Sequence, residues 1–149
     1  MADEFDFDDE AKTVTFKGAR LHLLLGLIQR AKFGDRHDRL LLLSEWIADL
    51  STRITGALGL QQPAPQVGVA DELTIFDNNL VLAIRDAIIA EAATIGWWTK
   101  TAEERRRYLR EVVAAPVGMT DRDIERIEGA IEAWIIHARL ALAAMVATN

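Results

Sequence analysis

The sequence predicts an all-α fold, a single-domain bundle of about five helices behind a short extended N-terminal arm. Three observations lead to this prediction. Apolar residues recur at spacings of three and four along most of the chain, which is the period of an amphipathic helix. Half of the 149 residues are hydrophobic and only three are proline, so the chain can bury a core. Only one short segment has the composition of a strand.

The first 18 residues form the arm, which begins with an acidic segment. Residues 3–10 hold six carboxylates: Asp3, Glu4, Asp6, Asp8, Asp9 and Glu10. The chain has 23 acidic and 17 basic side chains, so the 17 acids outside this segment equal the bases in number. A body without positive excess disfavours nucleic acid as a partner, because phosphate recognition relies on lysine and arginine.

The arm continues with KTVTFKG, residues 12–18. Thr13 to Phe16 favour a strand, and Gly18 ends the run. No later segment offers a clear second strand. We therefore expect one extended segment that lies on the helices, with pairing to a second chain as the alternative.

The helical domain is expected over residues 19–149. The first helix ends at Gly34, and Asp38 is a suitable N-cap for the second. The segment 59–70 holds two prolines and two glycines, which predicts a loop. The third helix is the most apolar, and Gly96 weakens its end. The expected helices cover about 19–33, 39–58, 71–98, 102–114 and 121–147.

The last two helices have clear start signals. Thr101 followed by Glu104 matches a capping box, in which two helix-end donors are satisfied reciprocally. Thr120 with Asp123 resembles a second, weaker one. The second half of the fifth helix is apolar nearly all round, with Ile136 and Leu140 on the side opposite its core stripe. We expect this half to be central to the bundle or buried against another subunit.

The stretch GWWTKTAEERRRYL, residues 96–109, raises the question of an anion-binding surface. Arg106, Arg107 and Arg110 fall on the face of the fourth helix opposite its apolar side. Acids are interleaved, and Glu103 precedes Arg107 by four residues, a spacing that stabilises a helix without a ligand. We interpret the run as a salt-bridged face. The alternative is a site for an anionic partner at the three arginines.

The usual catalytic and metal-binding motifs are absent from the sequence. There is no cysteine, and none of the three histidines lies in a Glu-x-x-His or HExxH motif. The two serines are not in a G-x-S-x-G elbow, and there is no phosphate-binding loop. We expect no catalytic residues, no metal site and no cofactor, so an enzyme is disfavoured.

Two acids and one base fall within apolar arcs of the predicted helices. Asp77 and Glu91 project onto the main stripe of the third helix, and Arg105 onto that of the fourth. A carboxylate in such a position is costly unless it is paired, and such groups often mark sites. The hypothesis is a polar pocket between helices around these three residues. The alternative is a structural ion pair or a position at the rim of the stripe.

The four tryptophans are candidates for the core or for an interface. Trp46 and Trp134 lie on or beside core stripes, which indicates burial. Trp97 and Trp98 are adjacent and therefore about 100° apart on a helix. With Trp98 facing inward, Trp97 is expected at the surface or against a partner.

Three classes of function fit these patterns. The first is a non-enzymatic interaction or assembly protein, either self-associating or a subunit of a larger complex; its interface candidates are Phe16, Trp97, Ile136 and Leu140. The second is a small-molecule-binding protein or enzyme with an inter-helical pocket around Glu91 and Arg105. The third is a nucleic-acid-related protein, or an acidic mimic acting through residues 3–10. The first is preferred for two reasons. The fifth helix has more apolar surface than one core stripe requires, and the sequence contains no catalytic motif.

The expected partners are a second copy of the chain or another protein. The N-terminus lacks the basic and apolar regions of a signal peptide. No stretch supplies about 18 uninterrupted apolar residues, since the closest, 80–98, is interrupted by Arg85, Asp86 and Glu91. We therefore expect no membrane span and a cytoplasmic location.

Overall fold

The structure is a computed structural model that describes residues 5–8, 10–11, 13–16, 18–34, 38–60 and 75–148. Five of the α-helices in this part have seven residues or more, which confirms the all-α class. The helices are α1 (Gly18–Phe33), α2 (Arg39–Leu42), α3 (Glu45–Ala57), α4 (Asn78–Ala90), α5 (Ala92–Ile95), α6 (Ala102–Tyr108) and α7 (Asp121–Ala147), with a 3-10 turn η2 (Trp97–Thr99) and a π-helical segment η3 (Leu109–Val113).

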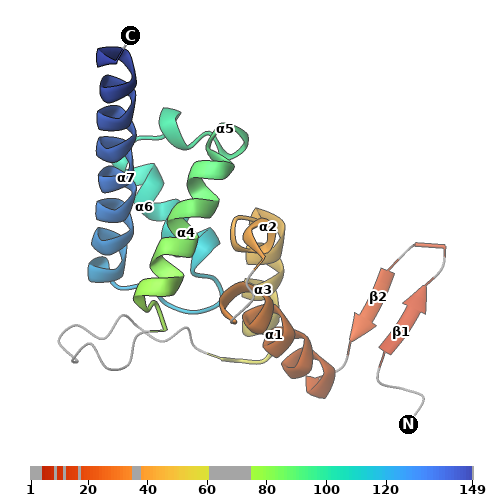
Figure 1. Cartoon of the computed structure of the whole chain (residues 1–149). Helices are drawn as coiled ribbons and strands as arrows, with labels where there is room; N and C mark the ends of the chain where they lie inside the picture. Colours follow the sequence, from red (N-terminus) through yellow and green to blue (C-terminus); the bar gives the residue numbers. More distant parts are fainter. Residues whose placement is uncertain are drawn as a thin grey trace.

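The N-terminal arm contains a β-hairpin, so the expectation of a single unpaired strand is wrong. Strand β1 (Phe5–Asp8) pairs antiparallel with β2 (Thr13–Phe16), with Phe5 opposite Phe16. Strand β1 is FDFD, which lies within the acidic segment. Its aromatic and acidic residues alternate, and this is the two-residue period of a strand. At the turn, Asp8 Oδ1 accepts hydrogen bonds from the Glu10 and Ala11 amides, both at 3.0 Å. In Figure 1 the hairpin lies beyond the start of α1, far from α7.

The predicted helix 39–58 is two helices rather than one. Asp38 caps α2 as expected, by accepting from the Leu40 amide at 2.8 Å. The helix stops after one turn, and Ser44 Oγ then accepts from the Ile47 amide and caps α3. The apolar stripe continues across the break, so periodicity alone did not reveal it.

The predicted helix 71–98 is also interrupted. In the described part it begins at Asn78, and Asp77 is its N-cap. Glu91 separates α4 from the short helix α5, and Gly96 ends α5 with a φ of +65°, in the left-handed region that glycine adopts readily. Residues 61–74, which include most of the predicted loop and the start of this helix, lie outside the described residues.

The last two helices begin where their capping boxes predicted. Both reciprocal bonds are present at Thr101 with Glu104 and at Thr120 with Asp123. The bounds of α7, Asp121–Ala147, agree with the prediction. The fourth predicted helix changes its hydrogen-bond pattern after Tyr108 and continues as the π-helical η3.

Buried side chains form a main core and a smaller second cluster. The main core lies between α2, α4, α6, η3 and the first half of α7, and Figure 1 shows α4 and α7 side by side there. The second cluster joins α1 to α3 through Leu25, Ile28, Ile47 and Ile54. The largest fully buried side chains of the main core include Trp97, Phe76, Leu42, Ile84, Ile88, Leu109, Ile124 and Ile127.

Lys32 on α1 connects the two clusters from a fully buried position. Its Nζ donates hydrogen bonds to the carbonyl oxygens of Val112 at 2.8 Å and Ala115 at 2.5 Å. Both carbonyls lie where η3 ends, so the lysine supplies donors to oxygens that no following helical turn can satisfy. Burial lowers the pKa of Lys32 from 10.5 to about 7, because the charged form is poorly solvated there.

This shift predicts a pH-dependent stability. Above pH 7 the folded chain releases the Lys32 proton while the unfolded chain keeps it up to 10.5. The unfolded state therefore binds more protons, and the free energy of unfolding rises with pH. We expect an increase of roughly 3 kcal/mol between pH 7 and about pH 9.5, below the range where tyrosine titrates. Urea unfolding at a series of pH values measures it.

The matched control compares two lysines. Lys32→Met is expected to abolish the rise, whereas Lys100→Met is expected to retain it, because Lys100 is only partly buried. An equal pH slope in the wild type and in Lys32→Met would show that another group causes it.

Candidate interaction surface

The first half of α7 is fixed to the rest of the domain. Ile124, Ile127 and Ile131 are buried in the main core. Arg126 reaches across to the start of α4, where its Nη1 donates to the Phe76 carbonyl at 2.5 Å. These contacts define where α7 lies and in which direction its second half points.

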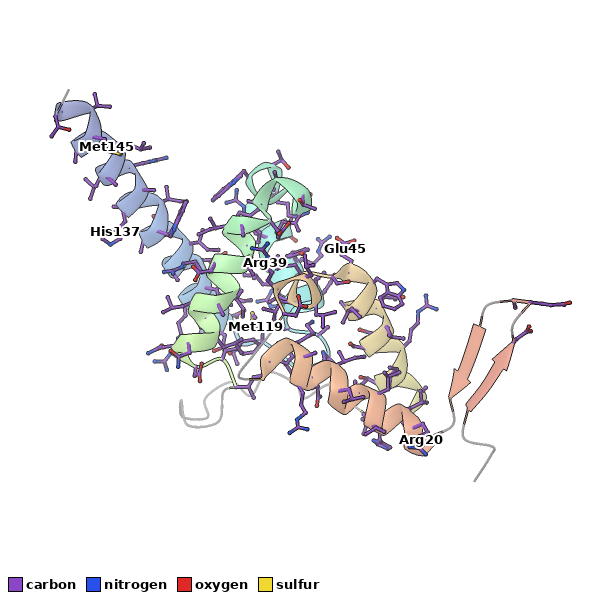
Figure 2. All side chains as sticks on the ribbon, turned by 45° about the vertical axis from the view of Figure 1, so that its right-hand side comes forward. Arg20, Arg39, Glu45, Met119, His137 and Met145 are labelled. Atoms are coloured by element: carbon purple, nitrogen blue, oxygen red, sulfur yellow. The ribbon has the colours of Figure 1, made fainter. Side chains whose placement is uncertain are left out.

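The second half of α7 extends beyond the other helices. Figure 2 shows His137 and Met145 on this free part of the helix. Ile131 is the last buried residue of α7, and residues 139–148 are all exposed. Ile135 packs partly buried on the main core, and the other large apolar side chains of this half are between 40% and 75% exposed: Trp134, Ile136, Leu140, Leu142, Met145 and Val146. We name this part, residues 132–148, the free half of α7.

The free half has two apolar faces. Leu142 and Met145 continue the core stripe of α7 past the point where α4 ends, on the inward face. Ile136 and Leu140 lie about 140° and 180° from Ile131 and form the outward face. A helix that is apolar on opposite sides is normally covered on both. Among the described helices, α7 has the most exposed large apolar side chains. They include the predicted interface candidates Ile136 and Leu140.

By length and composition α7 could cross a membrane, and among the described helices it alone has this property. Of the most apolar 18-residue stretch of this helix, a share of only 6% is buried against the rest of the protein. However, the free half spans only about 25 Å, less than the roughly 30 Å of a bilayer core. Arg139 lies near its middle, where a bilayer solvates charge poorly. Both features disfavour a membrane span made by the free half alone.

The orientation expected for the two adjacent tryptophans is wrong. Trp97 is 2% exposed, and its ring contacts Tyr108 edge to face at 6.4 Å between centroids. Trp98 is 47% exposed. The prediction assumed a continuous helix, but Gly96 turns the backbone and η2 resets the rotation. Trp97 thus belongs to the core. Trp46, expected in the core, is instead 71% exposed, and Trp134 is 40% exposed.

The three predicted pocket residues do not converge. Asp77 caps the beginning of α4 and Glu91 follows its end, so about 20 Å of helix separates them. Glu91 is partly buried and forms an ion pair with Arg39 at 3.3 Å. Arg105 donates from Nε to the Trp97 carbonyl at 3.0 Å and lies over the Trp97 ring. Each of the three has a structural role at a helix end.

The three candidate anion-binding arginines are all engaged with carboxylates. Arg106 holds Glu128 through two hydrogen bonds of 3.1 and 3.0 Å, and this contact raises the pKa of Arg106. Arg110 pairs with Asp121. Arg107 is 3.7 Å from Glu103, at the predicted spacing of four. The ion pairs of Arg106 and Arg110 join α6 and η3 to α7, so this face of the α6–η3 segment holds helices together.

A cleft of about 640 Å³ lies between α3 and the α6–η3 segment. Its polar groups are largely engaged within the chain. Tyr108 donates its hydroxyl to the Leu43 carbonyl at 2.8 Å, and burial raises the pKa of that hydroxyl. Glu104 caps α6, and the hydrogen bond that its carboxylate accepts from the Thr101 amide lowers its pKa. Among the described residues, no group of three metal-ligating side chains converges here or elsewhere.

The positions of the other candidates add little to a site. Phe16 lies in β2, but its side chain is outside the described part, as are residues 3, 4 and 9 of the acidic segment. Comparison of the chain with models of protein families, with curated proteins and with solved structures gives no match. Among the described elements, the free half of α7 carries the largest number of exposed large apolar side chains.

The corrected tryptophan orientation leads to a prediction. Trp97→Ala should lower the free energy of unfolding by about 3–5 kcal/mol, because it empties a core position beside Tyr108. The control, Trp98→Ala, should cost less than about 1 kcal/mol, since that side chain is half exposed. Chemical unfolding followed by circular dichroism measures both. Equal losses would mean that the two rings are packed alike.

Proposed function

We propose that this chain is a non-enzymatic assembly protein that self-associates through the free half of α7. One observation carries the proposal, namely the six large apolar side chains that this half presents to solvent. Exposed apolar surface concentrated on one element is typical of a protein interface. The other exposed large apolar residues are spread over α1, α2, α3, α4 and the connecting segments.

The energetics support association over a free monomer. Burying a large apolar side chain contributes about 1.5–3 kcal/mol when it was fully exposed before. Association costs on the order of 4–15 kcal/mol in lost translation and rotation. The six side chains lie on two faces of the helix, so a contact on one face buries only some of them from each copy. Burial from both copies together is comparable with the lower end of that cost.

The competing functions have less support among the described residues. A pocket around Glu91 and Arg105 lacks convergence, because the two side chains contact different partners. Arg106, Arg107 and Arg110 are each paired with a carboxylate of the same chain. A self-associating surface requires neither a cofactor nor a catalytic group.

The experiment that tests the proposal measures the solution mass of the full chain by light scattering over a range of concentrations. We expect a mass above that of the monomer. The double variant Leu140→Asp/Leu142→Asp places a charge on each apolar face of the free half, and it should be monomeric. Circular dichroism should show an intact fold, because both leucines are more than 60% exposed.

The control introduces the same two substitutions elsewhere. Leu23 and Leu27 on α1 are 54% and 55% exposed, so Leu23→Asp/Leu27→Asp adds equal charge at similar exposure. This variant should retain the oligomer. A wild type that is monomeric at every concentration would contradict the proposal, as would an oligomer lost only in the α1 variant.

A further inference from the structure

The outward face of α7 has the residue pattern of a two-helix contact. Small or apolar exposed residues recur along it at alternating spacings of four and three. This is the heptad pattern in which one side of a helix faces a second helix along its length. The residues are Gly129, Ala133, Ile136, Leu140, Ala143 and Ala147.

Gly129 at the start of this face leaves open space beside the helix, as Gly26 on α1 and Gly56 on α3 also do. Nothing lies within 4 Å of the position that a Cβ would occupy there. Glycine inside a helix costs about 1 kcal/mol relative to alanine. A glycine in open space is instead suited to the close approach of a neighbouring chain.

Two oppositely charged residues lie along one edge of this face. Glu132 and Arg139 are seven residues apart, so they lie within about 20° of each other around the helix. Both are exposed, and within the described part neither has a hydrogen bond or an ion pair in its own chain. They are about 10 Å apart along the axis, too far to pair with each other.

We infer that two copies of the chain bind through the outward faces of their α7 helices, in antiparallel orientation. This inference rests on the proposed self-association and specifies its geometry. In an antiparallel pair, equivalent edges of the two helices meet across a two-fold axis. Glu132 of each copy then faces Arg139 of the other, which gives two interhelical ion pairs.

The same register matches large side chains with small ones. With Glu132 opposite Arg139, Leu140 of one copy packs on Gly129 of the other, and Ile136 packs on Ala133. The charges select this arrangement against two alternatives. A shift by one heptad brings the two copies of Arg139 together. A parallel pair places the Glu132 and Arg139 edge against the edge of His137 and Ala144, without opposite charge.

The two domains do not clash sterically when the α7 helices pair in antiparallel orientation. Each α7 has its own domain on the inward side, through Ile124, Ile127 and Ile131. The second copy approaches from the outward side, where residues 129, 133, 136 and 140 are exposed along the whole contact. The two domains therefore lie on opposite sides of the helix pair.

The test is a charge exchange, read as the dimer dissociation constant by sedimentation equilibrium of the full chain. Arg139→Glu and Glu132→Arg, each alone, bring like charges together at two places and should raise the constant by about tenfold or more. The double variant Glu132→Arg/Arg139→Glu restores opposite charges and should return the constant to near the wild-type value. Equal constants for all four proteins would overturn the antiparallel register.

Three further variants test which face forms the contact and in which direction the helices run. Leu140→Asp on the outward face should dissociate the dimer, whereas Leu142→Asp, at nearly equal exposure on the inward face, should not. Because the chain has no cysteine, Ala147→Cys is a direct probe of direction. An antiparallel pair keeps the two thiols apart, so a disulfide-linked dimer under oxidation would overturn the proposal.

These outcomes separate the two proposals. A monomeric wild type removes both. A dimer that ignores the charge exchange, or that dissociates only with Leu142→Asp, keeps the proposed self-association and removes the antiparallel outward contact.

Discussion

The contact between α4 and α7 determines what the rest of the molecule presents to solvent. The two helices differ in length by a factor of about two, with 13 residues in α4 and 27 in α7. These lengths correspond to about 20 and 40 Å. The buried isoleucines of α7 and the bond from Arg126 to the Phe76 carbonyl fix the overlap at the start of α7. Half of α7 must therefore project past the core.

Interruptions of the helices are where long polar side chains attach. Carbonyl oxygens at a helix end lack the amide of a following turn and need another donor when they are buried. Lys32 supplies one to Val112 at the end of η3, and Tyr108 supplies one to Leu43 between α2 and α3. Arg105 serves Trp97 in the same way. The bonds of Lys32 and Tyr108 thus cross-link elements that are distant in sequence, whereas the bond of Arg105 joins the neighbouring elements η2 and α6.

Capping motifs in the sequence predicted where helices begin, because the interactions that start a helix lie within a few residues of one another. The capping boxes at Thr101 and Thr120 gave the starts of α6 and α7, because both bonds of a capping box lie within four residues. The break at Ser44 was missed because the apolar stripe crosses it. The orientation of Trp97 was missed because Gly96 resets the helix rotation, which periodicity assumes to be constant.

The candidate surface was predicted in part. The sequence showed that Ile136 and Leu140 lie opposite the core stripe, since this follows from spacing alone. It could not show that the inward face of the same segment is also exposed, because that depends on the length of α4 and on its register against α7. The pocket hypothesis failed for a similar reason, as Asp77 and Glu91 share a stripe but lie at opposite ends of a helix.

The buried lysine also couples folding to the proton balance of the surrounding buffer. At a pH between about 7 and 10.5, unfolding returns Lys32 to water and takes up a proton. The buffer supplies that proton, so the heat absorbed on unfolding includes the ionisation enthalpy of the buffer. The same transition therefore absorbs more heat in an amine buffer than in phosphate at equal pH, although the free energy of the fold is unchanged.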